Sequence, residues 1–210
     1  MSHPDILLIG AGGHSHACID AIEQQGRYRI AGLVGAAGDA QIAHLGYPVI
    51  GTDADLAQLV RVCGLALIAV GQIRSAVPRM RLYRLATALG FELPAIVAPS
   101  AYVSRHARIG AGTVVMHGAI VNAGARVGAN CIVNSRALIE HDASVGDHCH
   151  IATGAILNGD VTVGTGSFVG SGSVIMQGLS IGQDCTVGMG LSVRHGQPDH
   201  ARYLGPRDRP

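Results

Sequence analysis

Apolar residues recur at every sixth position through the second half of the chain. The series has no insertion and contains these residues: Val103, Ile109, Val115, Val121, Val127, Val133, Ile139, Val145, Ile151, Leu157, Val163, Val169, Ile175, Ile181, Val187 and Val193. A helix repeats about every 3.6 residues and a strand every two, so neither explains a period of six held for this length. A hexapeptide repeat is typical of a parallel β-helix, in which three repeats form one triangular coil. The pattern therefore predicts an all-β domain, a parallel β-helix, over residues 98–194.

The positions beside this apolar series support the prediction. Two residues before most of its members stands a small side chain, such as Ala119 or Ala137, which would let the wall of a coil close. One residue after many members stands Gly or Asn, which we expect to adopt the positive φ of a tight corner. Residues 18 positions apart would stack in neighbouring coils, about 4.8 Å apart. Cys131, Cys149 and Cys185 are spaced in this way among the small residues, so we expect core thiols rather than disulfides or metal ligands.

Residues 1–97 show a different pattern, in which apolar runs alternate with helical periodicity. We expect strands over residues 5–10, 28–34, 47–51 and 65–70, a glycine-rich turn and helix after the first strand, a helix capped by Thr52 or Asp53, and a helix over 73–89. Strands that alternate with helices predict a small parallel sheet of the Rossmann type. Residues 195–210 are rich in Pro, Arg and His, and we expect an irregular tail over the last coil.

The composition of the 210-residue chain narrows its class. Hydrophobic residues make up 48% while aromatic residues make up only 3%, which suits a narrow core of Val, Ile and Ala. The formal net charge is +1, which gives no electrostatic reason to expect nucleic acid or an anionic membrane as a partner. No apolar run is long enough for a transmembrane helix, and the first residues lack the features of a signal peptide. We therefore expect a cytoplasmic protein.

A glycine-rich turn at residues 10–15 joins the first predicted strand to the first helix. The free N–H groups and the positive end of the helix dipole at such a turn form a site where a phosphate group could bind. Ser15 stands where a dinucleotide fingerprint has its third glycine, and Gly35 stands where an acidic residue would end the second strand. These departures argue against NAD and leave two interpretations, another nucleotide ligand and a purely structural turn.

His141 is the first candidate for chemistry within the repeat. It follows Ile139 by two positions, which places it at a corner with its side chain pointing outward, and Glu140 and Asp142 flank it. Neighbouring carboxylates can orient and polarise an imidazole. Gly159 should lie one coil below His141, where a small residue leaves room for a ligand and an N–H group for a carbonyl oxygen. The alternative is a surface histidine that is satisfied by solvent or backbone.

His150 is the second candidate, one position before Ile151. Its neighbours 18 positions away are Ile132 and Phe168, so this ladder is expected to be apolar and to point outward, as in a contact with another subunit. A surface role is again the alternative. The histidines of the repeat are not spaced by multiples of 18, so they should not stack into a metal site, and we predict no metal.

Three features occur together: GAGGH in a short Rossmann-like domain, an unbroken hexapeptide repeat, and an E-H-D step with a second His nine residues later. In this combination the chain resembles the bacterial nucleotide-sugar and sialic acid acetyltransferases, including N-acetyltransferases of bacillosamine and perosamine biosynthesis. The resemblance implies a left-handed β-helix, a homotrimer with each active site between two subunits, and a role in glycan biosynthesis. It also implies direct transfer of an acetyl group from acetyl-CoA to the amino group of a nucleotide-linked 4-amino-4,6-dideoxyhexose in a ternary complex.

Three alternatives to this function stay open. An O-acetyltransferase of sialic acid or a related sugar shares the fold and His141 and differs in the acceptor pocket. A non-catalytic trimer that binds a nucleotide sugar would not bind coenzyme A. A metal-dependent hydratase, like the zinc carbonic anhydrases built on a β-helix, would need three converging histidines.

Carried over to this sequence, the resemblance implies roles for residues of the β-helix. His141 would be the general base, supported by Asp142 and more weakly by Glu140. Four residues would contact coenzyme A: His150 beside the thioester and pantetheine, Gly159 through its N–H group, and Gly170 and Ser171 along the channel.

The resemblance also implies a nucleotide-sugar site on the N-terminal domain. The residues in contact with the phosphates and the sugar would be Gly12, Gly13 and His14, with Gly71 lining the pocket and Asn134 and Ser135 facing the sugar from the β-helix. Relatives carry an aspartate for the nucleotide base where this chain has Gly35, and Asp39 is the nearby candidate to replace it.

Overall fold

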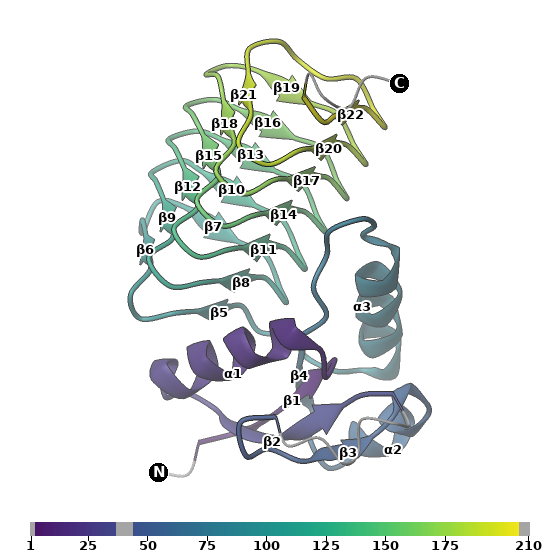
Figure 1. The fold of residues 1–210 in the computed structure, drawn as a ribbon. Helices are drawn as coiled ribbons and strands as arrows, with labels where there is room; N and C mark the ends of the chain where they lie inside the picture. Colours follow the sequence, from purple (N-terminus) through teal and green to yellow (C-terminus); the bar gives the residue numbers. More distant parts are fainter. Residues whose placement is uncertain (1–2, 37–43, 206–210) are drawn as a thin grey trace.

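The computed structural model describes residues 3–36 and 44–205 and consists of an α/β half followed by a left-handed parallel β-helix. In Figure 1 the coils of the β-helix stack above the α/β half. Helix α1 (Gly13–Gln25) lies directly beneath the first coil, and helix α3 (Val77–Leu89) stands beside the β-helix. This arrangement confirms the predicted fold class.

Four parallel strands form the sheet of the α/β half, in the order β3-β2-β1-β4. They are β1 (Asp5–Ile9), β2 (Arg29–Val34), β3 (Val49–Gly51) and β4 (Leu65–Ile68). In β1, Ile6 and Leu8 pack in a cluster with α1, whereas Leu7 and Ile9 pack in a cluster with α2 (Leu56–Leu59) and α3. Because alternate residues face two covered sides, the strand needs the continuous apolar run that the sequence shows.

Helix α1 also joins the two halves of the chain. One hydrophobic cluster contains Cys18, Ile19 and Ile22 of α1 together with Ile96, Val114 and Ile132 of the β-helix. The α/β half is therefore attached to the β-helix through a shared core. No helix in the described ranges is long and apolar enough to cross a membrane.

Helix α3 begins at Val77, four residues later than the sequence pattern predicts. A helix that started at Ile73 would need an N–H group on Pro78 to bond to the carbonyl of Arg74, and proline has none. The residues between β4 and α3 form a loop instead. The predicted cap is confirmed at Thr52, which forms a capping box with Asp55 at the start of a short 3-10 helix, η2 (Asp53–Asp55).

The β-helix is built from two-residue strands in three parallel sheets. The five-stranded face contains β7 (Arg108–Ile109), β10 (Arg126–Val127), β13 (Ser144–Val145), β16 (Thr162–Val163) and β19 (Ser180–Ile181). The seven-stranded face contains β5 (Ile96–Val97), β8 (Val114–Val115), β11 (Ile132–Val133), β14 (His150–Ile151), β17 (Phe168–Val169), β20 (Thr186–Val187) and β22 (Arg202–Tyr203). The six-stranded face contains β6 (Tyr102–Val103), β9 (Ile120–Val121), β12 (Leu138–Ile139), β15 (Ile156–Leu157), β18 (Val174–Ile175) and β21 (Ser192–Val193).

Strands of neighbouring coils pair in register, so that Val133 lies opposite Ile151. The apolar residues at every sixth position pack in one core with the small residues that stand two places before them, which confirms the repeat. Cys131, Cys149 and Cys185 are free and buried, as predicted. The β-helix is longer than expected at both ends. Strand β5 begins at Ile96, and β22, in the segment predicted to be irregular, pairs with β20 and covers the last coil.

The corners differ from the sequence prediction in one respect. The residue with positive φ stands three places after a member of the apolar series, not one, as at Asp142 (φ 60°) and Gly166 (φ 77°). The glycine that stands one place after a residue of the apolar series is required for another reason. A Cβ atom on Gly110 would lie 2.5 Å from the carbonyl carbon of Gly128 in the next coil. Glycine is needed there because successive coils approach closely.

The ladder of Ile132, His150 and Phe168 was predicted to be a contact with another subunit, and this prediction is wrong. Ile132 is fully buried in the cluster that contains α1. His150 is only 7% exposed and contacts the backbone of Gln72, in the loop between β4 and α3. The chain itself covers this ladder, because the α/β half folds back over the seven-stranded face.

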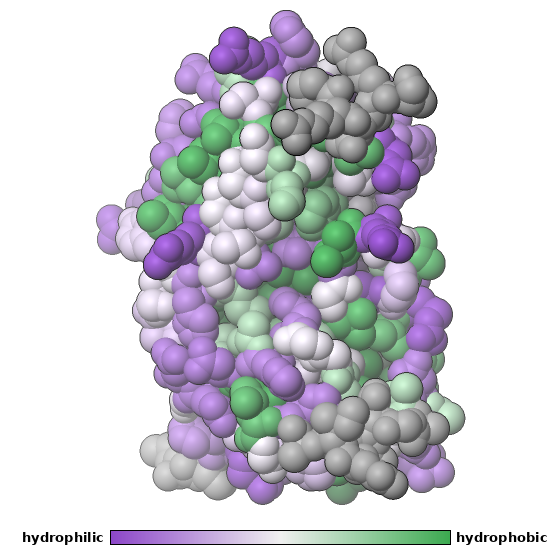
Figure 2. Space-filling model, in the orientation of Figure 1, coloured by the Kyte–Doolittle hydropathy of each residue, from purple (hydrophilic) through white to green (hydrophobic). Residues whose placement is uncertain are grey.

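A partly exposed apolar ladder lies on the six-stranded face instead, in which Tyr102 and Ile120 are exposed and the other three outward residues are half-buried. Its outward residues, in register across five coils, are Tyr102, Ile120, Leu138, Ile156 and Val174. Figure 2 shows a row of hydrophobic residues at the upper left, along the edge where Figure 1 labels β9, β12, β15 and β18. The corresponding positions on the five-stranded face are polar: Arg108, Arg126, Ser144, Thr162 and Ser180.

Candidate active site

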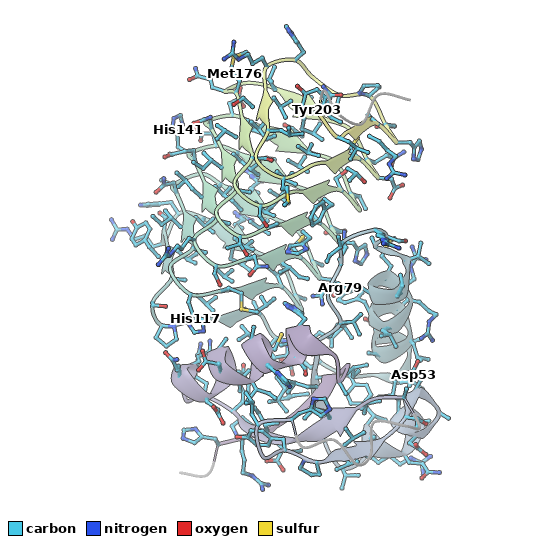
Figure 3. The ribbon with its side chains drawn as sticks, viewed as in Figure 1. Asp53, Arg79, His117, His141, Met176 and Tyr203 are labelled. Carbon is cyan, nitrogen blue, oxygen red and sulfur yellow. The ribbon has the colours of Figure 1, made fainter. Side chains whose placement is uncertain are left out.

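His141 occupies the corner between β12 and β13 and projects from the edge of the β-helix (Figure 3). Its side chain is 66% exposed, and its Nδ1 atom lies 2.9 Å from Oδ2 of Asp142. A carboxylate that accepts a hydrogen bond from Nδ1–H favours the tautomer in which Nε2 carries no proton and is free to accept one. This hydrogen bond raises the pKa of His141 above its usual value, and the negative charges of Asp142, Glu140 and Asp160 raise it further.

Glu140 faces a different way. Its Oε2 atom accepts hydrogen bonds from Nδ2 of Asn122 (2.9 Å) and from the N–H group of His141 (3.2 Å). The Glu140 carboxylate therefore stabilises the backbone conformation of the corner. Of the two predicted acidic residues, Asp142 is therefore the one that contacts the imidazole of His141.

Gly159 lies one coil further along, directly against the ring of His141. A Cβ atom on Gly159 would come within 2.7 Å of Cε1 and Nε2 of that ring. The expectation that this glycine leaves room for a ligand is therefore wrong, because the imidazole of His141 occupies the space. The N–H group of Gly159 donates no hydrogen bond to any residue that the structure describes, so an unpaired donor lies beside the imidazole.

A second group of predicted residues meets where the α/β half joins the β-helix. His14 lies in the first turn of α1, and a Cβ atom on Gly71 would be 3.4 Å from the Cβ of His14. Burial lowers the pKa of His14 to about 3, and the nearby Arg79 and His150 contribute to the shift. The Nε2 atom of His14 is buried and, within the described ranges, has no hydrogen-bond partner.

His150 connects this group to the β-helix through a chain of hydrogen bonds. Its Nδ1 lies 2.5 Å from the carbonyl oxygen of Gln72, so Nδ1 carries the proton and donates it. Its Nε2 is then an acceptor, and Nδ2 of Asn134 donates to it over 3.1 Å. The Oδ1 atom of Asn134 accepts from the N–H group of Ser135 (2.8 Å). Burial lowers the pKa of His150 to about 4, so the ring is neutral at neutral pH.

The N-terminus of α1 is open to solvent. Gly12 is its N-cap and Gly13 its first residue, and nothing lies within 4 Å of where their Cβ atoms would be. No side chain caps the helix, so the positive end of its dipole is open at Gly12 and Gly13, whereas the N–H group of Ser15 donates to the carbonyl of Gly12 (2.9 Å). At the end of β2, the N–H group of Gly35 donates to the carbonyl of Gly51 (3.0 Å). Asp39, the candidate for the nucleotide base, lies outside the described residues.

The predicted residues of the β-helix fall on two different corners. Those that follow the seven-stranded face are Asn134, Ser135, Gly170 and Ser171. His141 and Gly159 follow the six-stranded face. His150 belongs with the first set, through Asn134. Within one chain the structure therefore does not place His150 beside His141, where a shared thioester site would require it.

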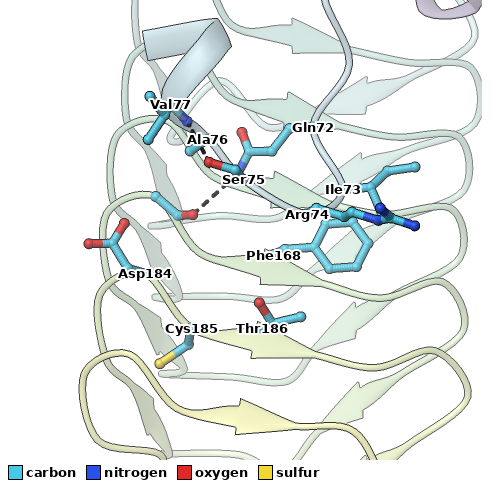
Figure 4. Close-up of a pocket in the computed structure, with 11 residues that line it drawn as sticks. Gln72, Ile73, Arg74, Ser75, Ala76, Val77, Phe168, Asp184, Cys185 and Thr186 are labelled. Carbon is cyan, nitrogen blue, oxygen red and sulfur yellow. Dashed lines mark hydrogen bonds between the residues drawn. The ribbon is translucent and has the colours of Figure 1, made fainter.

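Two polar residues in this region were not singled out by the sequence. The Nε2 atom of Gln72 donates to the carbonyl of Gly166 (3.2 Å), and Gln72 forms part of the wall of a cavity of about 280 Å³ with Phe168 (Figure 4). Arg79 is fully buried on the face of α3 that also carries Leu82 and Ala86. A charged residue at this helical spacing among apolar residues is the signal that could have revealed it.

Comparison with protein-family models matches both halves of the chain. Residues 5–81 match the model of the PglD N-terminal domain, and residues 160–194 match the hexapeptide repeat of succinyl-transferase. No curated protein sequence matches. Together, the fold and the corner site define a hexapeptide-repeat acetyltransferase with an α/β N-terminal domain.

Several solved structures are similar over nearly the whole chain. PerB from Caulobacter crescentus, in complex with CoA and GDP-perosamine, is 34% identical with a TM-score of 0.89, over 96% of this chain and 94% of that one. The acetyltransferase domain of PglB from Neisseria gonorrhoeae FA1090, in complex with acetyl coenzyme A, is 33% identical with a TM-score of 0.88, over 96% of each chain. WeeI from Acinetobacter baumannii AYE, 23% identical with a TM-score of 0.82 over 95% of this chain and 96% of that one, has the same fold. The chain belongs to the family of bacterial nucleotide-sugar acetyltransferases that includes the perosamine N-acetyltransferase of Caulobacter crescentus.

Proposed function

We propose that the chain transfers the acetyl group of acetyl-CoA to the amino group of a nucleotide-linked 4-amino-4,6-dideoxyhexose. The observation that carries the proposal is the pair of His141 and Asp142, which lies over Gly159 at an exposed corner of the β-helix. The family supports it, because PerB is known in complex with CoA and GDP-perosamine. We place the reaction in the cytoplasm, where acetyl-CoA and nucleotide sugars are made.

The reaction needs a general base. An amine attacks only when its lone pair is free, and it must lose a proton as it adds to the thioester carbon. We assign this proton to Nε2 of His141, while Asp142 keeps the proton on Nδ1 and stabilises the imidazolium ion that forms. The C–N bond forms first, and the C–S bond then breaks. The thiolate of coenzyme A leaves and takes the proton from the imidazolium, which restores the base.

Two further features favour direct transfer. The unpaired N–H group of Gly159 is our candidate donor to the oxyanion of the tetrahedral intermediate. The thiols of Cys131, Cys149 and Cys185 are buried in the core, where they cannot meet a thioester. Catalysis would then depend mainly on the positions of the two substrates, with no acetylated enzyme.

We assign the diphosphate of the acceptor to the open N-terminus of α1, at Gly12 and Gly13, where backbone N–H groups and the helix dipole favour an anion. His14 and Gly71 form the inner wall of this site. The low pKa of His14 keeps it uncharged, so it would bind the acceptor as a hydrogen-bonding group and not as a cation. Asn134 and Ser135 would face the sugar from the β-helix.

We further propose that the active site is completed by a second copy of the chain in a homotrimer. The six-stranded face, with its apolar ladder, lies between the corner of His141 and the corner of Gly170 and Ser171. If this face packs against another copy, the two corners of neighbouring copies can meet, and coenzyme A can lie between them. An apolar surface ladder is the kind of surface that such an interface buries.

A thiol-release assay with acetyl-CoA tests the proposed function. The acceptor panel contains UDP-, GDP- and dTDP-linked 4-amino-4,6-dideoxyhexoses and free sialic acid. Turnover of one amino sugar supports the proposal. It also identifies which nucleotide base the chain recognises, although Gly35 stands where relatives carry an aspartate for that base. Turnover of sialic acid alone would show an O-acetyltransferase. Silence across the panel, together with no binding of coenzyme A by calorimetry, would contradict an enzyme of either kind.

A further inference from the structure

Arg79 is fully buried, and the part of the chain that the structure describes places no carboxylate in an ion pair with it. Its guanidinium group donates instead to three main-chain carbonyls. Nη1 bonds to Ile68 and to Val70 (2.8 Å), and Nε bonds to Asn130 (3.1 Å). Burial lowers the pKa of Arg79 only to about 10, so the group is charged at neutral pH. A buried cation without an anion is costly, which calls for an explanation beyond packing.

The three carbonyls belong to the two halves of the chain. Ile68 ends β4 and Val70 follows it, whereas Asn130 lies at a corner of the β-helix. In Figure 3 Arg79 lies between α3 and the coils. The planar fork of an arginine can hold several acceptors at fixed angles, which the single ammonium group of a lysine cannot do. Arg79 therefore ties the end of β4 to the β-helix.

The segment that Arg79 holds forms part of the proposed site. Val70 is bonded to Arg79, Gly71 lies against His14, and Gln72 is bonded to the β-helix twice. The carbonyl of Gln72 accepts from Nδ1 of His150, and its side chain donates to the carbonyl of Gly166. Arg79 and the β-helix thus hold the segment at its two ends.

The position of this segment sets the state of His150. Because the Gln72 carbonyl accepts a hydrogen bond from Nδ1–H, the proton of the neutral ring stays on Nδ1. Nε2 is then an acceptor, and the NH₂ group of Asn134 donates to it. Together with the N–H group of Ser135, which donates to Oδ1, this contact fixes which way the amide of Asn134 points and leaves its second N–H for another acceptor. If the Gln72 carbonyl moved away, His150 could change tautomer. Nδ2 of Asn134 would then lose its acceptor, and only the N–H group of Ser135 would still hold the amide.

We propose that Arg79 is a positioning residue for acyl transfer, which fixes residues 70–72 against the β-helix and thereby holds His150 as the Nδ1–H tautomer that orients Asn134. The inference rests on the proposed function, in which Asn134 faces the acceptor sugar. A purely structural cross-link between the two halves is the competing explanation.

Kinetics and imidazole NMR on the full chain test this proposal. Arg79→Lys keeps the charge and loses the fork, and Arg79→Met loses both. Arg84→Met, at an exposed position of the same helix, is the matched control. We expect kcat to fall about 100-fold in Arg79→Met and at least about tenfold in Arg79→Lys, measured well below each melting temperature, since small displacements of positioning groups have effects of this size. The control should keep the wild-type kcat.

The NMR measurement separates positioning from mere stability. Two-bond ¹H–¹⁵N correlations should show His150 as the Nδ1–H tautomer in the wild type and in Arg84→Met, and as the other tautomer or a mixture in the Arg79 variants. In an Asn134→Ala background, Arg79→Lys should lower kcat by less than about threefold, because both changes act on one element. An unchanged His150 tautomer, an unchanged kcat in folded protein, or failure of Arg79→Lys to fold would overturn the proposal in favour of a structural cross-link. Absence of wild-type turnover on any amino sugar would instead refute the proposed function, and the tautomer would still report on Arg79.

Discussion

The imidazole of His141 lies over Gly159 of the next coil, so closely that a single methyl group on Gly159 would come within 2.7 Å of Cε1 and Nε2. Gly159→Ala should therefore push the imidazole away from its position beside the Gly159 N–H group. Because the side chain of His141 is exposed and can move, the cost to folding should be small. We expect kcat to fall at least about tenfold, while the melting temperature changes by no more than about 2 °C.

A matched glycine separates this effect from a general cost of replacing glycine. Gly64 also has no positive φ, and nothing lies within 4 Å of its Cβ position. Gly64→Ala should keep full activity. Equal activity in Gly159→Ala and wild type would show that the position of His141 over this glycine does not matter for the reaction.

The charge of Asp142 should appear in the pH dependence of kcat. His141 acts as a base only when neutral, so kcat should rise with pH through its pKa. The hydrogen bond to Asp142 and the carboxylate charges raise that pKa, so the rise lies above the ordinary range of a histidine near 6.5. Asp142→Asn keeps an acceptor for Nδ1 but removes a charge, and it should move the acid limb of the profile to lower pH. Asp53→Asn, in the α/β half, is the control and should leave the limb in place. If the acid limb of the kcat profile stays at the same pH in Asp142→Asn, the group that titrates there is not His141.

The apolar ladder of the six-stranded face should control assembly. Ile156 points outward within this ladder, between Leu138 and Val174, and Thr162 points outward from the five-stranded face of the same coil. Ile156→Arg should yield monomers in light scattering and lose activity, because a buried unpaired charge opposes the interface. Thr162→Arg should remain a trimer with wild-type activity. If Ile156→Arg still forms trimers, the interface lies elsewhere on the chain.

The sequence was sufficient for the β-helix because one local rule is repeated in every coil. Val133 pairs with Ile151 for the same reason that each apolar residue pairs with the next but two, so the register follows from the period alone. The exposed corner of His141 with Asp142 follows from the same rule. The sequence predicts positive φ at the wrong position of each corner, because glycine occurs there for two different reasons. One place after an apolar residue, as at Gly110, the next coil leaves no room for a Cβ atom; three places after it, the backbone has a positive φ.

What the sequence could not reveal depends on how the two halves pack together. No period relates Gln72 or Arg79 to His150. The hydrogen bond between Gln72 and His150, and the effect of the Arg79 charge on this histidine, arise only when the α/β half folds over the seven-stranded face. For the same reason the ladder of Ile132 and His150 looked exposed, although α1 and the loop after β4 cover it. Local sequence patterns predict which side chains point outward from the β-helix, but not which other parts of the chain cover them.

His14 and His150, whose pKa values are lowered by burial, should make the protein less stable in mild acid. In the folded chain the pKa values of His14 and His150 are about 3 and about 4, so both rings stay neutral, whereas in the unfolded chain they take up protons below about pH 6.5. The unfolded state thus binds more protons between about pH 6.5 and 4, and their contribution to stability, complete above 6.5, is lost as pH falls. Two such groups can lower the free energy of unfolding by at most about 2.7 kcal/mol per pH unit (2 × 1.36).

Urea unfolding at about pH 7.5, 6.0 and 5.0 measures this loss. His14→Asn should remove about half of the dependence that these two histidines cause. His106→Asn, at an exposed corner, should leave the dependence unchanged. A wild-type stability that is flat over this range would show that neither ring is held neutral by the fold.

The central claim is that His141 is the base in acetyl transfer, and the most direct test compares His141→Asn with the wild type at saturating acetyl-CoA and amino sugar. Asparagine keeps a polar side chain of similar shape and cannot accept the proton. The account predicts a kcat lower by about 10²–10⁴-fold and a calorimetric Kd for coenzyme A within about threefold of the wild type. A variant that turns over at the wild-type rate would contradict the account, and one that loses coenzyme A binding in proportion to its activity would show that His141 binds the donor instead of accepting the proton.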